Sequence, residues 1–196
     1  MEIDAKEVLY STIAKIDKNR IESTVTSSPL QVPAIVKEIC SQCTASLNSH
    51  TDYDKPKIHS DLLEALMHYL LTLTHLPSER KIKYDNDIEI CIVIPGLKQL
   101  KADPKRTLVI SFPKSLDADD INTHVNKLLK VQPQKSNVWL VFGYYNGTIM
   151  DSCKGFTVFA QDDFVQDPFK PFSSIIDEIK LFVETNKIKS FKIFRS

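Results

Sequence analysis

The sequence predicts an α/β fold in which a central mixed β-sheet is flanked by helices. One observation is a pair of strand-like runs at 87–94 and 107–114, whose apolar residues become continuous, as in strands covered on both faces. The other is the order of the elements around them: apolar residues at helical spacing at 60–74 and 117–131, with strand patterns between and after these helices. Helices and strands that alternate in this way are typical of a sheet covered by helices.

The composition is that of an ordinary globular protein. The chain has 196 residues, of which 42% are hydrophobic, enough for one domain or for a core with a small helical extension. Lys and Arg together number 25, as do Asp and Glu, so the net charge is zero. Zero net charge argues against a protein that coats nucleic acid or membrane through bulk charge, although it leaves local basic patches open.

Several functional classes lack their sequence signals. Neither GxGxxG nor a P-loop pattern is present, so a small-molecule enzyme on an unrelated α/β fold is the weakest alternative. The first residues contain no basic region followed by an apolar stretch, and we predict no signal peptide. No apolar run approaches the roughly 18 to 20 residues that a membrane-spanning helix needs. We therefore expect a cytoplasmic protein with no membrane partner.

The N-terminal part is predicted to be helical. Residues 5–16 form a helix capped by Asp4, a polar, turn-prone stretch follows at 23–29, and a second helix runs from about 28 past Cys43. A loop rich in Asn, Ser, Asp and Pro at 48–56 separates this part from the rest. We predict an N-terminal helical extension over 1–56 and an α/β domain over 57–196.

The α/β domain is predicted to begin with a leucine-rich helix at 60–74. Strands at 79–84 and 88–94 form a hairpin, a basic loop covers 96–106, and a strand follows at 108–112. A helix at 117–131 and a buried strand at 137–142 come next, followed by an Asn-Gly turn at 146–147. The remaining predicted elements are a strand at 156–159, a helix at 171–187 and a last strand at 188–194.

The cysteines and histidines do not form a recognisable metal site. Cys40 and Cys43 make a CxxC without a second CxxC or HxxxH, and they lie inside a helical pattern. Together with Cys91 and Cys153 they are expected to be ordinary thiols. No two histidines have the HExxH spacing of a zinc hydrolase.

From 60 to 142 the element order is helix, strand, strand, strand, helix, strand. This order resembles the shared core of the PD-(D/E)XK superfamily of restriction-endonuclease-like nucleases. The resemblance implies a restriction-endonuclease-like αβββαβ core with an N-terminal helical extension. It also implies a chemistry in which acids at the ends of two adjacent strands hold Mg²⁺, which activates water, beside a lysine on the same face.

The resemblance assigns site residues one by one. The helix acid of the family matches Glu64, and the acid of the second strand, which would ligate the metal, matches Asp87 or Glu89. Cys91 lies on the same face as those two residues; if the acid of the family belongs at that position, it has been replaced. The E-x-K motif falls within 110–114, and Lys114 is its lysine.

The acid of the E-x-K motif is missing in either register. With the lysine at Lys114, the acid position is Phe112; with the acid position at Ser111, Pro113 stands where the lysine belongs. Phenylalanine cannot ligate a metal, and a hydroxyl is a poor substitute for a carboxylate. These residues favour a catalytically degenerate member without a cofactor, acting as a nucleic-acid-processing accessory or a protein-interaction module. The alternative is an active Mg²⁺-dependent DNA or RNA nuclease that uses Asp87, Glu89 and Lys114.

Two local basic patches predict where nucleic acid would bind. The loop contributes Lys98, Lys101, Lys105 and Arg106, and the C-terminal tail contributes Lys187, Lys189, Lys192 and Arg195. The alternative interpretation is that these side chains are solvated and protect an edge strand against aggregation. Tyr144 and Tyr145 are predicted to be exposed enough to stack on a base or to line an interface. A protein partner or a second copy of the chain is the alternative to nucleic acid.

Overall fold

The structure is a computed structural model that describes residues 3–50, 52–85, 88–145 and 149–188. Its centre is one six-stranded mixed sheet with the strand order β1-β2-β3-β4-β5-β6. The strands are β1 (Glu79–Asp85), β2 (Ile88–Ile94), β3 (Leu108–Ser111), β4 (Val138–Phe142), β5 (Thr157–Ala160) and β6 (Lys170–Pro171). The first three pair antiparallel, and β3 to β6 pair parallel. The predicted α/β class with a mixed sheet is confirmed.

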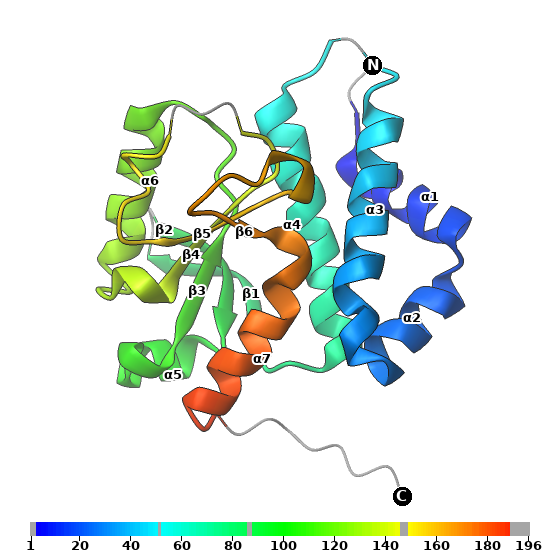
Figure 1. Ribbon diagram of the computed structural model, residues 1–196. Coiled ribbons are helices and arrows are strands. Elements are labelled where there is room, and N and C mark those ends of the chain that lie inside the picture. The colour runs from blue at the N-terminus through cyan, green and yellow to red at the C-terminus, as the bar shows by residue number, and fades with distance from the viewer. Residues whose placement is uncertain (1–2, 51, 86–87, 146–148, 189–196) are drawn as a thin grey trace, which may run out of the picture.

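Helices cover both faces of this sheet (Figure 1). One face carries α4 (Lys55–Thr74) and α7 (Ile175–Thr185), and the other carries α5 (Leu97–Ala102) and α6 (Ala118–Leu129). Outside α4 lies a further layer formed by α1 (Ala5–Ile16), α2 (Lys18–Ser27) and α3 (Val32–Leu47). Each face of the sheet therefore has its own apolar core, and the one under α4 continues into the N-terminal helices.

Helix α4 has a broad apolar surface because it is packed on two sides. Asp54 caps its first turn by accepting a hydrogen bond from the backbone N–H of Lys57 at 3.1 Å. The leucine-rich stripe that predicted this helix is buried: Leu62, Leu63, Leu66, Met67, Leu70 and Leu71. A helix that contacts a sheet on one side and other helices on the other needs apolar residues around most of its circumference.

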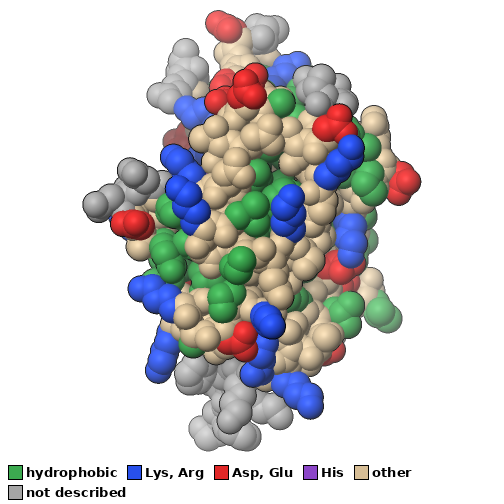
Figure 2. Space-filling view, turned by 90° about the vertical axis from the view of Figure 1, so that its left-hand side faces the viewer, with side chains coloured by type: hydrophobic (Ala, Val, Ile, Leu, Met, Phe, Trp, Pro, Cys, Tyr) green, Lys and Arg blue, Asp and Glu red, His purple; other side chains and the backbone are tan. Residues whose placement is uncertain are grey.

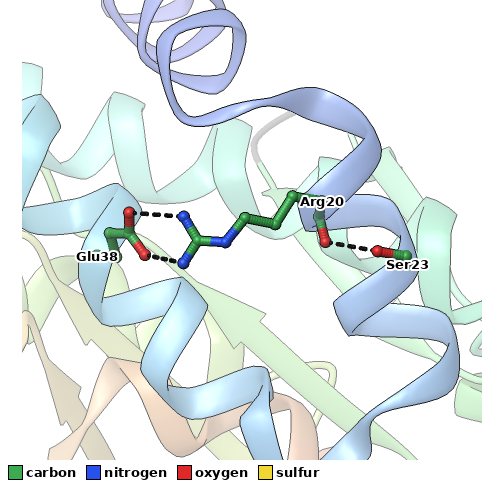
Figure 3. Close-up of polar contacts among 3 residues, drawn as sticks. All are labelled: Arg20, Ser23 and Glu38. Atoms are coloured by element: carbon green, nitrogen blue, oxygen red, sulfur yellow. Dashed lines mark hydrogen bonds and ion pairs between the residues drawn. The ribbon is translucent and has the colours of Figure 1, made fainter.

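The N-terminal helices share the core of α4. Leu9 of α1 and Ile39 of α3 are fully buried in the same apolar cluster as Leu66. At the surface of this layer the Arg20 guanidinium binds the Glu38 carboxylate through two hydrogen bonds of 3.2 and 2.8 Å, which joins α2 to α3 (Figure 3). The boundary at residue 56 stays a prediction.

Several segments differ from the predicted elements. Helix α4 begins at Lys55, five residues before the predicted start at 60, and α7 begins at Ile175, four residues after the predicted start at 171. The stretch at 23–29 was predicted to be a turn, but α2 runs through most of it, because Ile21 and Val25 are buried one turn apart in an otherwise polar segment. The loop at 96–106 contains the short helix α5, and the two-residue strand β6 was not predicted. The Asn-Gly turn at 146–147 and the last strand beyond Ile188 lie outside the described residues. No described helix is both long and apolar enough to cross a membrane.

The start of α4 sits directly on the end of β4. Gly143 follows β4, and a Cβ atom at this position would collide with the backbone of His59. The Ser60 hydroxyl donates a hydrogen bond to the Pro113 carbonyl oxygen at 2.6 Å, which ties the same turn of α4 to the end of β3. These contacts fix the first turns of α4 over the carboxyl ends of the parallel strands.

Replacing Gly143 with Ala is expected to destabilise the protein by about 1 to 3 kcal/mol, because the added methyl group forces the His59 backbone away from β4. Urea unfolding followed by circular dichroism measures the change. Ser41→Ala on the exposed side of α3 is the control, with an expected change within about 0.5 kcal/mol. Equal midpoints for Gly143→Ala and the wild type would refute the contact.

Candidate active-site cleft

A cleft of about 1040 Å³ opens between α4 and α6, beside β2 and the segment that follows β3. It brings together three residues that the sequence assigned to one site: Glu64 of α4, Glu89 of β2 and Lys114 after β3. Asp87, the other predicted metal ligand, lies outside the described residues. The catalytic assignment of these residues stays a prediction.

The predicted nucleic-acid-binding lysines lie elsewhere. Lys98, Lys101, Lys105 and Arg106 belong to α5 and the turn before β3, whereas Lys114 follows β3, so the strand separates the two groups. Arg106 donates hydrogen bonds of 3.0 and 2.6 Å to the Asn186 carbonyl oxygen at the end of α7. The Arg106 side chain therefore also stabilises the C-terminal end of α7.

Lys114 is held by an acid that the sequence analysis did not identify. Its Nζ lies 2.6 Å from the Asp61 carboxylate of α4. Burial alone would lower the pKa of Lys114, but the hydrogen bond and charge of Asp61, with the nearby Glu64, outweigh it and raise the pKa. Asp61 precedes Glu64 by three residues, so both project from one side of α4. The three-residue spacing between Asp61 and Glu64 is the sequence signal that could have identified Asp61 as a site residue.

Glu64 lies deeper in the cleft than an acid on a solvated face. Its side chain is 13% exposed. Burial raises the pKa of this carboxyl, and the charges of Asp61 and Glu89 add to the rise, while Lys114 and Lys81 oppose it. The Glu64 carboxyl thus binds its proton more tightly than a solvated glutamate does.

His68 stands one turn after Glu64 and does not pair with it at neutral pH. The Nε2 atom of His68 lies 4.0 Å from the Glu64 carboxylate, too far for a hydrogen bond. Burial and the positive charges of Arg80 and Lys81 lower the pKa of His68 to about 4. The imidazole is therefore neutral near pH 7, and its buried Nε2 has no hydrogen-bond partner among the residues that the structure describes.

The end of β3 selects between the two registers of the E-x-K motif. Phe112 belongs to the apolar core under α4 and, like Lys114, lines the cleft. Ser111 points to the other face, where its hydroxyl lies 2.6 Å from Nε2 of His124 in α6. Phe112 and Lys114 thus share the α4 side, as a strand with alternating side chains requires.

A local change of face in β2 brings Cys91 to the cleft. Ile88 and Ile90 pack into the core under α6, whereas Ile92 and Ile94 pack into the core under α4. The regular alternation therefore breaks around Cys91, opposite Lys81, whose φ is 51°. Burial, reinforced by the charge of Glu64, raises the pKa of the Cys91 thiol, so it stays protonated.

The described residues do not fit a complete metal site. No group of three or more His, Cys, Asp or Glu side chains in this part of the chain is close enough to hold an ion. The side chain of Phe112 offers no ligand atom, and a protonated Cys91 thiol is a poor ligand for Mg²⁺, which prefers oxygen. Magnesium binding at Glu89 remains a prediction.

The charges around the cleft nearly cancel. Its lining contains five lysines and six acids: Lys6, Lys57, Lys81, Lys114, Lys127, Asp4, Asp54, Asp61, Glu64, Glu89 and Asp120. A phosphate group that entered would meet at least as many acidic as basic side chains. The cleft alone is therefore a weak electrostatic attractor for a polyanion.

Tyr144 and Tyr145 differ in exposure. Tyr144 is half-buried beside Phe164, with ring centroids 5.2 Å apart. Tyr145 was predicted to be exposed but is buried, with its ring centroid 5.0 Å from that of Phe169. Because Tyr145 lies in the core under α6, its ring is not available to stack on a base.

The sheet order and its flanking helices define a restriction-endonuclease-like α/β fold. The restriction endonuclease PspGI in complex with substrate DNA matches this structure with a TM-score of 0.63, at 14% sequence identity over 93% of this chain and 94% of that chain. Metal-depleted Ecl18kI matches in its complexes with uncleaved, modified DNA and with uncleaved DNA, with TM-scores of 0.58 and 0.57 at 10% and 9% identity. Both matches cover 98% of this chain and 83% of the other.

These likenesses establish the fold. They extend well beyond the residues 60–142 that carried the sequence resemblance, since they cover almost the whole chain. No protein-family model and no curated protein sequence matches the chain.

Replacing Glu64 with Gln is expected to raise the free energy of unfolding at neutral pH. Burial raises the pKa of the Glu64 carboxyl in the folded protein above its ordinary value of 4.5, so ionisation destabilises the fold. Wild-type stability therefore falls as pH rises through this range, and the variant avoids that loss. The advantage should disappear at a pH low enough to protonate Glu64 in both states.

Urea unfolding at neutral pH and at acidic pH measures this difference. Glu184→Gln on the exposed side of α7 is the matched control. A stability gain for Glu64→Gln that does not change with pH would contradict the raised pKa.

Proposed function

We propose that this protein is a nuclease-like DNA-binding protein whose nuclease site is catalytically degenerate. The observation that carries the proposal is Phe112, which occupies the cleft-facing position two residues before Lys114. In the PD-(D/E)XK motif that this segment resembles, an acid at that position holds the metal. A restriction-endonuclease-like fold that matches DNA complexes supports DNA as the ligand.

Phe112 is part of the core and cannot be exchanged for an acid at little energetic cost. It is 2% exposed and packs with Ile110 and Ile92 under α4. A carboxylate at this position would be buried beside apolar side chains, which costs several kcal/mol unless it is paired. The local packing thus favours an apolar residue where metal chemistry needs a charged one.

Lys114 is also engaged differently from a catalytic lysine beside a metal-bound acid. Its ammonium group is paired with Asp61 on α4 rather than with a carboxylate on its own strand. This pair neutralises the lysine charge inside the cleft, which leaves less of it to stabilise a reacting phosphate.

An active metal-dependent nuclease is the second candidate. It is favoured by the convergence of Glu64, Glu89 and Lys114 on one cleft. Glu89 with the predicted Asp87 would then hold Mg²⁺ together with water molecules.

We expect the wild-type protein to leave single-stranded DNA, duplex DNA and RNA uncut in the presence of Mg²⁺ or Mn²⁺, because the E-x-K acid is absent. Gel analysis of end-labelled substrates measures cleavage, and fluorescence anisotropy in EDTA measures duplex binding, which should persist. The matched variant is Glu64→Gln/Glu89→Gln, which removes the two described cleft acids that remain candidate ligands.

Two results would overturn the proposal. Metal-dependent cleavage by the wild type that the Glu64→Gln/Glu89→Gln variant loses would establish the active nuclease. An absence of duplex binding at low salt would exclude DNA as the ligand. Cleavage that the double variant retains would come either from a site that uses Asp87 or from a contaminating enzyme. Adding Asp87→Asn to the variant distinguishes the two, because only the contaminant would still cut.

A further inference from the structure

Positive charge is concentrated at one end of this electrically neutral chain. Residues 97–107 and 128–137 contain six basic side chains and one acidic side chain, Asp103. These two segments therefore carry a net charge of +5, and the rest of the chain carries −5. Such segregation creates a local potential that the overall charge conceals.

The fold joins the two segments into one surface. Gln132 is fully buried, and its amide group donates hydrogen bonds to the carbonyl oxygens of Pro104 at 2.8 Å and Thr107 at 2.7 Å. The Asn137 amide group donates to the Lys105 carbonyl oxygen at 3.0 Å. Two side-chain amides thus hold the turn before β3 against the loop that follows α6, and they fix the backbone that bears the lysines.

Five lysines form this basic surface: Lys98, Lys101, Lys105, Lys130 and Lys135. All five are exposed, and none forms an ion pair with any residue that the structure describes. In contrast, Lys18, Lys114, Lys154, Lys170 and Lys180 each have an acidic partner within 4.0 Å. Figure 2 shows Lys and Arg side chains over the lower part of this face, where α5 and the end of α6 lie.

Aromatic rings support two of these lysines. The Nζ of Lys135 lies 5.3 Å from the centroid of the Phe156 ring, and that of Lys101 lies 5.5 Å from the centroid of the Tyr84 ring. A ring contact of this kind orients an ammonium group without neutralising its charge. The two lysines therefore remain available to an anion.

We propose that the basic surface binds the phosphate backbone of duplex DNA. This inference rests on the proposed DNA-binding function and assigns that function to a surface separate from the cleft. Lysines are mobile point charges that suit phosphates, which position a duplex without specifying its sequence. The large exposed apolar side chains of the described residues, Tyr10, Leu30, Met150 and Leu181, all lie outside the two segments, so the surface lacks an anchor for a lipid bilayer.

Helix α6 connects the basic surface to the cleft. Lys127 lines the cleft, and Lys130 follows it by three residues at the end of the helix. Three residues correspond to about 4.5 Å along a helix axis. The basic surface therefore borders the nearly neutral cleft at the end of α6.

The triple variant Lys105→Gln/Lys130→Gln/Lys135→Gln tests the surface. The control is Lys15→Gln/Lys18→Gln/Lys37→Gln in the N-terminal layer, which changes the net charge equally. Fluorescence anisotropy with a labelled DNA duplex at several salt concentrations gives the slope of log Kd against log salt. If each lysine neutralises one phosphate, the slope should fall by about 2.7 in the triple variant and stay unchanged in the control.

The outcomes separate this inference from the proposed function. Wild-type binding with an unchanged slope in the triple variant would overturn the basic surface and leave DNA binding intact. Equal loss in both variants would also overturn it, because only net charge would then matter. Failure of the wild type to bind at all would overturn the proposed function itself. Urea unfolding of each variant verifies that the fold is retained.

Discussion

The structure depends on the burial of α4 between the sheet and the N-terminal helices. This helix presents apolar residues around most of its circumference, and neither the sheet nor the N-terminal layer can cover both sides alone. Burying side chains such as Leu62 and Leu66 stabilises the fold by about 1.5 to 3 kcal/mol each. The three-layer arrangement is the packing solution to this sequence, and it holds the first turns of α4 against the ends of β3 and β4 through Ser60 and Gly143.

The cleft follows from that placement. Because the first half of α4 lies over the carboxyl end of β3, Asp61 and Glu64 reach the residue that leaves this strand, Lys114. The change of face in β2 adds Cys91 to the same wall. Partial burial then decides the protonation of the group: Glu64 holds its proton more tightly, the Cys91 thiol stays neutral, and Lys114 keeps its charge beside Asp61.

Acidic and basic residues are equal in number in this protein, but they are separated in space. Within the cleft, acids and lysines nearly balance, so the interior of the site has little net attraction for a polyanion. At the other end of β3, two loops tied by Gln132 and Asn137 expose lysines that no described acid neutralises. This separation of charge is the basis of the proposal that a ligand with many phosphates binds outside the cleft.

The sequence by itself determined the class of the fold, because the long helix at α4, the apolar runs of β2, β3 and β4, and the capped helix α6 each have strong local periodicity. It also identified Glu64, Glu89 and Lys114 as candidates for one site through the resemblance in element order. Tertiary structure decided the rest. Helix α2 forms because Ile21 and Val25 are buried by neighbours distant in sequence, and Asp61 becomes the partner of Lys114 through a contact between α4 and the segment after β3. The basic surface likewise needs the buried Gln132 amide to join two segments. These features depend on long-range contacts, and no local periodicity encodes them.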